Sequence, residues 1–161
     1  MRRRPSILRV AIASAAIGVA LLVGGCGNSQ NDEAPAACLA TPNGYLQALR
    51  SAPGPVVLQG GVTISDCLVP EQSGGQLASI GQSMVVAATR LNLAARRDPG
   101  GPPTVQLGYL IGAVSKGADA IHTDLVRRLN SAARFTESGG TPPASFERAF
   151  GRGYAAGHQS G

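Results

Sequence analysis

Two long segments with helical apolar periodicity, separated by prolines and glycines, constrain the fold of this chain most strongly. In the first segment apolar side chains recur at steps of three and four residues, at Leu77, Ile80, Met84, Ala87, Leu91 and Ala94. In the second they recur at Leu107, Ile111, Val114, Ala118, Ile121, Leu125 and Leu129. Each series places one apolar stripe along an α-helix.

The stretch Asp98–Pro103 (DPGGPP) ends the first helix and turns the chain. A connection this short makes consecutive helices antiparallel neighbours, so the sequence predicts an antiparallel helical hairpin. Gly117 interrupts the second stripe, and a glycine in a helix interior costs up to about 1 kcal/mol relative to alanine. A kink or break near Gly117 is therefore an alternative to one straight helix.

The residues before this hairpin predict two short elements. Thr41 and Pro42 have the N-cap and first-turn pattern of a helix start. The β-branched runs 55–58 and 62–64 flank Gly60 and Gly61, which suit a two-residue β-hairpin turn. The expected fold class is therefore mainly α, with a small N-terminal segment that holds a short helix and a β-hairpin.

A C-terminal helix is expected to begin at Thr141–Pro142. Its aromatic side chains Phe146, Phe150 and Tyr154 are spaced four residues apart and so share one face. That face fits two interpretations: part of the core, which such spacing favours, or a stripe that binds a partner. Residues 157–161 are expected to fray.

The N-terminus has a different composition. Arg2, Arg3, Arg4 and Arg9 precede an uncharged run of 14 residues from Val10 to Val23, and this order is typical of a secretory signal. The run ends in Val23-Gly24-Gly25-Cys26, which resembles the lipobox of bacterial lipoproteins: an aliphatic residue, two small residues and cysteine. The resemblance covers residues 1–26. It implies that the Cys26 thiol carries a diacylglycerol and that residues 1–25 are removed.

An uncleaved transmembrane anchor is the alternative to this signal. From Val10 to Cys26 there are 17 uncharged residues, fewer than the roughly 20 that span a bilayer, so we favour the lipid anchor. Either arrangement places the domain at the extracytoplasmic face of the cell membrane. The polar stretch 26–37 then serves as a flexible tether, and 38–161 as one small helical domain.

The net charge of +5 comes largely from the signal, because four of the 14 basic residues and none of the nine acidic residues precede Cys26. The remainder is nearly neutral, which gives no indication of a nucleic-acid partner. Cys38 and Cys67 are then left for a disulfide, the default in an oxidising compartment. A metal or redox pair is disfavoured because the spacing is not CxxC and no histidine lies nearby.

No catalytic or metal-binding pattern stands out. His122 and Asp124 are two apart on a helix and point to different sides, although Asp119 lies one turn before His122. A solvated helix face is the preferred interpretation of this cluster, and no metal or cofactor is expected. The pairs Gly108/Gly112 and Gly153/Gly157 fit close helix contact in a bundle.

The sequence therefore favours an envelope lipoprotein with a non-catalytic binding or scaffolding domain, whose partner is the membrane and an envelope protein. The alternative is a lipid-anchored enzyme whose catalytic residues the sequence does not identify. A two-lobed solute receptor of an importer is disfavoured, because about 136 residues remain after cleavage.

Overall fold

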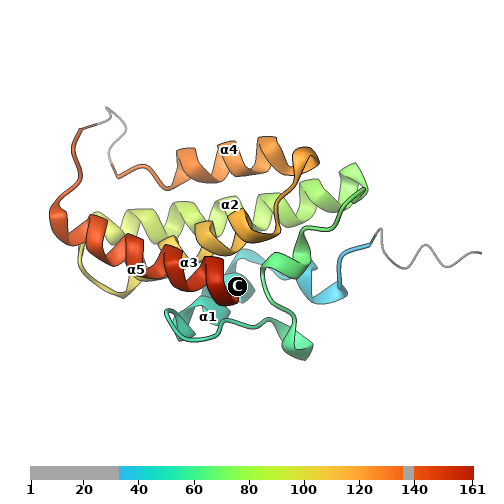
Figure 1. Ribbon diagram of the computed structural model, residues 1–161, viewed down its shortest axis with the longest axis horizontal. Coiled ribbons are helices and arrows are strands. Elements are labelled where there is room, and N and C mark those ends of the chain that lie inside the picture. The colour runs from blue at the N-terminus through green and yellow to red at the C-terminus, as the bar shows by residue number, and fades with distance from the viewer. Residues whose placement is uncertain (1–32, 136–139) are drawn as a thin grey trace, which may run out of the picture.

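A computed structural model describes residues 33–135 and 140–161 (Figure 1). Within these ranges the protein has no strand, and its five α-helices are α1 (Pro42–Ala48), α2 (Gly74–Ala95), α3 (Pro102–Gly117), α4 (Thr123–Ala132) and α5 (Ala144–Ser160). Short 3₁₀ turns join them: η1 (Ala36–Leu39), η2 (Leu49–Ser51), η3 (Gln59–Gly61), η4 (Ser65–Cys67) and η5 (Ala120–His122). The expected mainly helical class is confirmed. The predicted signal and Cys26 lie outside the described residues.

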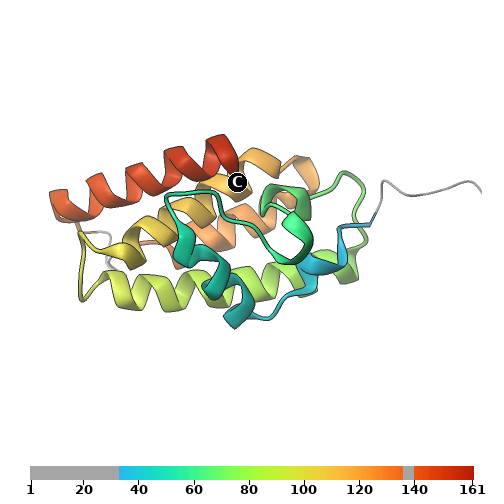
Figure 2. The same ribbon diagram turned by 90° about the horizontal axis from the view of Figure 1, so that it is seen from below.

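Helix α3 is the centre of the molecule. It lies between α2 and α5, while α4 and the N-terminal segments cover its other two sides (Figures 1 and 2). Every residue from Leu107 to Val114 is buried. A helix that is apolar on all sides belongs in a core, so the single stripe expected for this segment was too narrow.

Helices α2 and α3 run in opposite directions on either side of the turn 96–101 (Figure 2). The turn is fixed locally, because the Thr104 hydroxyl donates to the Asp98 carbonyl and the Gly101 N–H donates to the same oxygen. The core is built from helices that pack side by side around α3. None of the described helices is long and apolar enough to cross a membrane.

The small-residue pairs bring α3 and α5 into backbone contact. A Cβ at Gly108 or Gly112 would overlap the backbone carbonyl of Phe150 or Tyr154, and Gly153 and Gly157 lie equally close to carbonyls of α3. The residue numbers at these contacts increase in the same direction along both helices, so α3 and α5 run parallel, as Figure 2 shows. The expected close helix contact is confirmed.

The predicted second long helix is broken at Gly117. A Cβ at this position would overlap the backbone of Ser65, so only glycine lets η4 approach. Ala118 is extended, and Asp119 caps the next turn by accepting from the Ile121 N–H. Ile121, expected in the apolar stripe, is 44% exposed, and the single continuous stripe is wrong beyond this point.

Helix α4 then follows α2 in the same direction. A Cβ at Gly81 would lie 3.0 Å from the Leu125 side chain. Farther along both helices, the Asn92 amide donates to the carbonyls of Ala132 and Arg134. Leu125 therefore reaches the start of α2, as the periodicity indicated, although from a separate helix.

The predicted β-hairpin is wrong. Gly60 and Gly61 do have positive φ (74° and 81°), and the Leu58 N–H donates to the Val62 carbonyl. Backbone pairing does not continue beyond this hydrogen bond, because the Thr63 N–H donates to the Asp66 carboxylate and the chain enters η4. A local side-chain bond thus competes with strand pairing.

Three element boundaries differ from expectation. Ala34 is buried and η1 follows it, so the folded part begins before Cys38 and includes the end of the expected tether. Helix α5 begins at Ala144 with Pro143 as its N-cap, later than Thr141–Pro142. The expected frayed tail is instead its last turn, where the Lys116 ammonium donates to the Gly161 carbonyl (2.9 Å).

Candidate functional site

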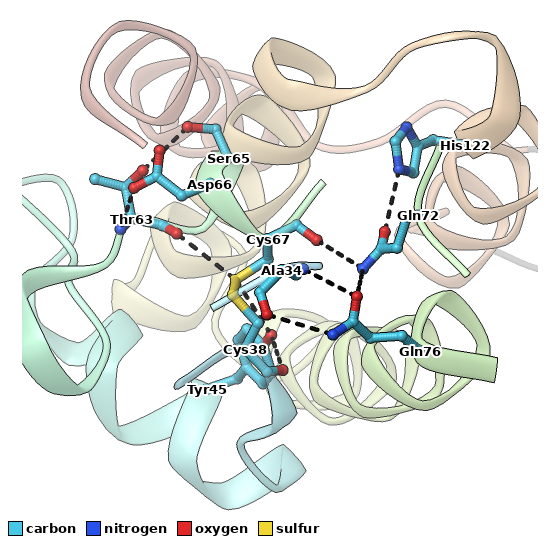
Figure 3. Close-up of a disulfide and its surroundings, with 10 residues drawn as sticks. All are labelled: Ala34, Cys38, Tyr45, Thr63, Ser65, Asp66, Cys67, Gln72, Gln76 and His122. Carbon is cyan, nitrogen blue, oxygen red and sulfur yellow. Dashed lines mark hydrogen bonds between the residues drawn. A yellow bond between two sulfur atoms is a disulfide. The ribbon is translucent and has the colours of Figure 1, made fainter. Parts of the chain in front are cut away.

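The disulfide predicted between Cys38 and Cys67 is present, with a Cα–Cα distance of 5.4 Å (Figure 3). It ties η1 to η4, and both cysteines are completely buried. The Tyr45 hydroxyl donates to the Cys38 carbonyl (2.7 Å), and burial raises the pKa of the Tyr45 phenol far above its ordinary value. The disulfide is therefore a structural link that is shielded from solvent in the folded protein.

Two glutamines extend from the disulfide toward α4 (Figure 3). The Gln72 amide donates to the Cys67 carbonyl (3.3 Å) and to the Gln76 side-chain oxygen (3.2 Å). Gln76 in turn holds both backbone groups of Ala34, accepting from its N–H (2.9 Å) and donating to its carbonyl (3.3 Å). Ser73 caps α2 by accepting from the Gln76 N–H, which leaves the Gln76 side chain free to bind Ala34.

His122 completes this chain of hydrogen bonds. Its side chain is fully buried, which contradicts the solvated face expected for it. Nε2 lies 3.3 Å from the Gln72 side-chain oxygen, and since the Gln72 amide nitrogen already donates twice, Nε2 is the donor. Nδ1 lies near both the Asp119 N–H (3.1 Å) and the Asp119 carboxylate (2.7 Å).

Asp119 thus offers a partner to either protonation state of Nδ1: its N–H to the neutral ring and its carboxylate to the protonated ring. Asp124, the other acid of the expected cluster, forms a surface ion pair with Arg127 instead. Because the imidazole is buried and bonded on both sides, the pair Asp119 and His122 fixes the polypeptide at the start of α4.

The aromatic face of α5 runs from the core to the surface. Phe146 is buried, Phe150 is half-buried and Tyr154 is 36% exposed. Neighbouring rings stack with centroids 5.7 and 6.4 Å apart. Phe146 therefore belongs to the core, whereas Tyr154 lies at the surface.

Two rings that sequence reasoning left out extend this row. His158 stacks on Tyr154 (6.1 Å), and Phe135 packs against Phe146 at a tilt of 60° (4.8 Å). His158 lies four residues after Tyr154, so the same spacing could have found it. Phe135 follows α4 and reaches Phe146 only through the tertiary fold, which no local pattern reveals.

An apolar pocket of about 300 Å³ opens beside the buried end of this row. Its walls come from the end of α4 and the start of α5: Asn130, Ala133, Arg134, Phe135, Gly140, Pro142, Phe146 and Phe150. Arg134 and Asn130 are exposed and four residues apart. The pocket therefore offers aromatic walls to an apolar group and a cation at its rim to an anionic one.

The described residues hold no group of three or more histidine, cysteine, aspartate or glutamate side chains placed to bind a metal ion. Comparison of the chain with protein-family models, curated proteins and solved structures finds no match. Its function is therefore argued from its own residues.

Proposed function

We propose that this chain is a bacterial cell-envelope lipoprotein, anchored at the extracytoplasmic face of the cell membrane through Cys26, with a non-catalytic domain that binds an envelope protein. The disulfide carries the first part of this proposal. Of three cysteines, Cys38 and Cys67 bond to each other, which leaves Cys26 without a partner within the chain. The cysteine left over is the one at the end of the lipobox-like stretch.

The buried disulfide also supports the proposed location outside the cytoplasm. Disulfides persist in oxidising environments outside the cytoplasm and are rare within it. The signal-like N-terminus and the disulfide are independent features of the chain, and both favour export. Two acyl chains on one cysteine suffice for stable membrane anchoring.

Mass spectrometry of the protein from solubilised membranes tests the anchor. The wild-type protein should begin at Cys26 and carry a diacylglycerol, whereas Cys26→Ala should remain unlipidated and unprocessed. The paired substitution Cys38→Ala/Cys67→Ala is the matched control and should leave lipidation intact. An unmodified Cys26 in the wild-type membrane fraction would contradict the proposal.

The aromatic pocket supports the binding role. Three phenylalanines line it, the polar groups of Asn130 and Arg134 stand at its rim, and Tyr154 continues the aromatic face to the surface. Aromatic side chains and arginine are the residue types enriched at protein–protein contacts. We assign this face, Phe146, Phe150 and Tyr154, to the partner.

A photoreactive amino acid placed at Tyr154 tests this face in intact cells. Irradiation should give a discrete cross-linked protein, and the arginine substitution Arg134→Glu should reduce its yield. A probe at Arg127, exposed elsewhere on α4, is the matched control and should give none. Equal products from both positions, or none from Tyr154, would argue against a partner at this face.

A further inference from the structure

An uncharged groove lies on the N-terminal side of the domain, away from the aromatic pocket. It has a volume of about 620 Å³ and is formed by η1, α1 and the segment before η3, with Ala36, Ala37, Leu39, Ala40, Gly44, Gln47, Ala48, Val57, Leu58 and Gln59 as its lining. None of these residues carries a charge. Gln47 and Gln59 are its only polar side chains.

Two large apolar side chains of this groove face solvent. Leu39 is 55% exposed and Val57 is 49% exposed, whereas their neighbours Cys38 and Val56 are completely buried. Single exposed apolar residues are ordinary on a protein surface. Leu39 and Val57 differ from such isolated residues because both line the same uncharged groove.

The position of the groove along the chain indicates what it contacts. Ala34 is fixed on the body by its two hydrogen bonds with Gln76, and the lining begins two residues later, at Ala36. Ala34 lies eight positions after Cys26 in the sequence. Eight residues span at most about 28 Å when fully extended.

We propose that this groove contacts the lipid surface that holds the anchor, with Leu39 and Val57 inserted at the boundary between headgroups and acyl chains. The inference rests on the proposed lipidation of Cys26. Insertion removes apolar side chains from water and, because the lining is uncharged, requires no charged group to lose its hydration. The two glutamine amides remain able to bond to headgroups or water.

A short tether makes a weak surface contact effective. Once Cys26 is in the bilayer, contact of the groove with lipid becomes an intramolecular event at high effective concentration. The contact fixes the orientation of the domain. Helices α1 and α4 lie on opposite sides of α2 and α3 in Figures 1 and 2, so α4 would point away from the membrane.

Tryptophan fluorescence tests this orientation directly, because the chain contains no tryptophan. Leu39→Trp and Val57→Trp place a probe on the groove. Arg127→Trp is the matched control, since the Arg127 side chain is 75% exposed and lies on α4. Each full-length lipidated variant is reconstituted into phosphatidylglycerol–phosphatidylcholine vesicles with ordinary or brominated acyl chains.

The bromine atoms should reduce the emission of Leu39→Trp and Val57→Trp at least twofold and leave Arg127→Trp unchanged. Equal emission at positions 39 and 127, whether both quenched or both unquenched, would overturn the inference. The intact mass of each sample reports the lipid on Cys26. A missing lipid would refute the proposed anchor, whereas a lipidated protein with an unquenched groove would refute only the membrane contact.

Discussion

The α3–α5 pair and the N-terminal segment solve the same packing problem in different ways. Helices α3 and α5 satisfy their own backbone groups and meet through glycines that allow backbone contact. The N-terminal cover, defined as residues 34–73, has one short α-helix, α1, and otherwise consists of 3₁₀ turns and irregular chain. Its backbone groups need partners from outside regular structure, and side chains supply several of them.

Single hydrogen bonds from particular side chains satisfy backbone groups of the cover. Tyr45 donates to the Cys38 carbonyl, the Val56 N–H donates to the Tyr109 hydroxyl (3.2 Å), and Gln76 holds Ala34. A disulfide closes the cover on itself. The comparison indicates that α3 and α5 depend on close apolar packing, while the cover adds to its own buried apolar side chains a few covalent and polar links that can be removed one at a time.

The largest effect is expected at the glycines of α3. The double substitution Gly108→Ala/Gly112→Ala places two methyl groups against backbone carbonyls of α5 that cannot move aside singly. Overpacking typically costs about 1–3 kcal/mol for each site, so the free energy of unfolding should fall by about 4 kcal/mol in a denaturant titration.

Gly151 is the matched control for this change. It lies within α5, and a Cβ there would meet nothing within 4 Å. Gly151→Ala should therefore raise stability by about 0.5–1 kcal/mol through helix propensity. If both variants unfold alike, close backbone contact does not hold α3 and α5 together.

The disulfide ranks second. Its ends are 29 residues apart, and cross-linking a loop of this length stabilises a fold by about 3.5 kcal/mol on the chain-entropy model. The paired variant Cys38→Ala/Cys67→Ala should melt at a markedly lower temperature than the wild type. In the wild type, thiol reagents should leave both cysteines unmodified until reduction, and free alkylation without reduction would contradict the bond.

The buried histidine should have an intermediate effect. His122→Leu leaves the Gln72 side-chain oxygen without its donor in the interior, and an unsatisfied buried polar group costs about 1–3 kcal/mol. The exposed His158 is the same residue type, and His158→Leu should change stability by less than about 0.5 kcal/mol. Equal effects in chemical denaturation would place His122 outside the network.

The smallest effect concerns Tyr45 and depends on pH. Because its pKa is raised in the folded protein, only the unfolded chain loses this proton as the pH rises above about 10. Stability from this group is thus complete below pH 10 and is lost at higher pH. Tyr45→Phe should cost about 1 kcal/mol at neutral pH and flatten the alkaline decline in melting temperature. An unchanged decline would indicate that Tyr45 ionises as freely when folded.

The sequence predicted those parts of the fold that depend on local chemistry. Periodicity gave α2, Thr41 and Pro42 gave the start of α1, and cysteine arithmetic gave the disulfide. The small-residue pairs indicated the contact of α3 with α5. Each of these predictions needs only the residues of one segment or, for the disulfide, the number of cysteines.

The errors arose where distant segments decide the outcome. Ser65 lies against Gly117 and so helps to fix the break after α3, and Asp66 takes the Thr63 N–H that a hairpin would need. His122 was expected at the surface, because Gln72, its buried partner, lies 50 residues away. The aromatic pocket likewise requires Phe135, which follows α4, to meet Phe146 of α5. No single-segment pattern contains these contacts.

Native-state hydrogen exchange before and after reduction tests most directly whether the core and the cover are held by different means. Reduction of Cys38–Cys67 should accelerate amide exchange across residues 34–73 by at least tenfold and leave the central amides of α3 and α5 protected. The unreduced protein in the same buffer is the control. Equal acceleration in α3, α5 and the cover would contradict the account, because the whole fold would then depend on the disulfide.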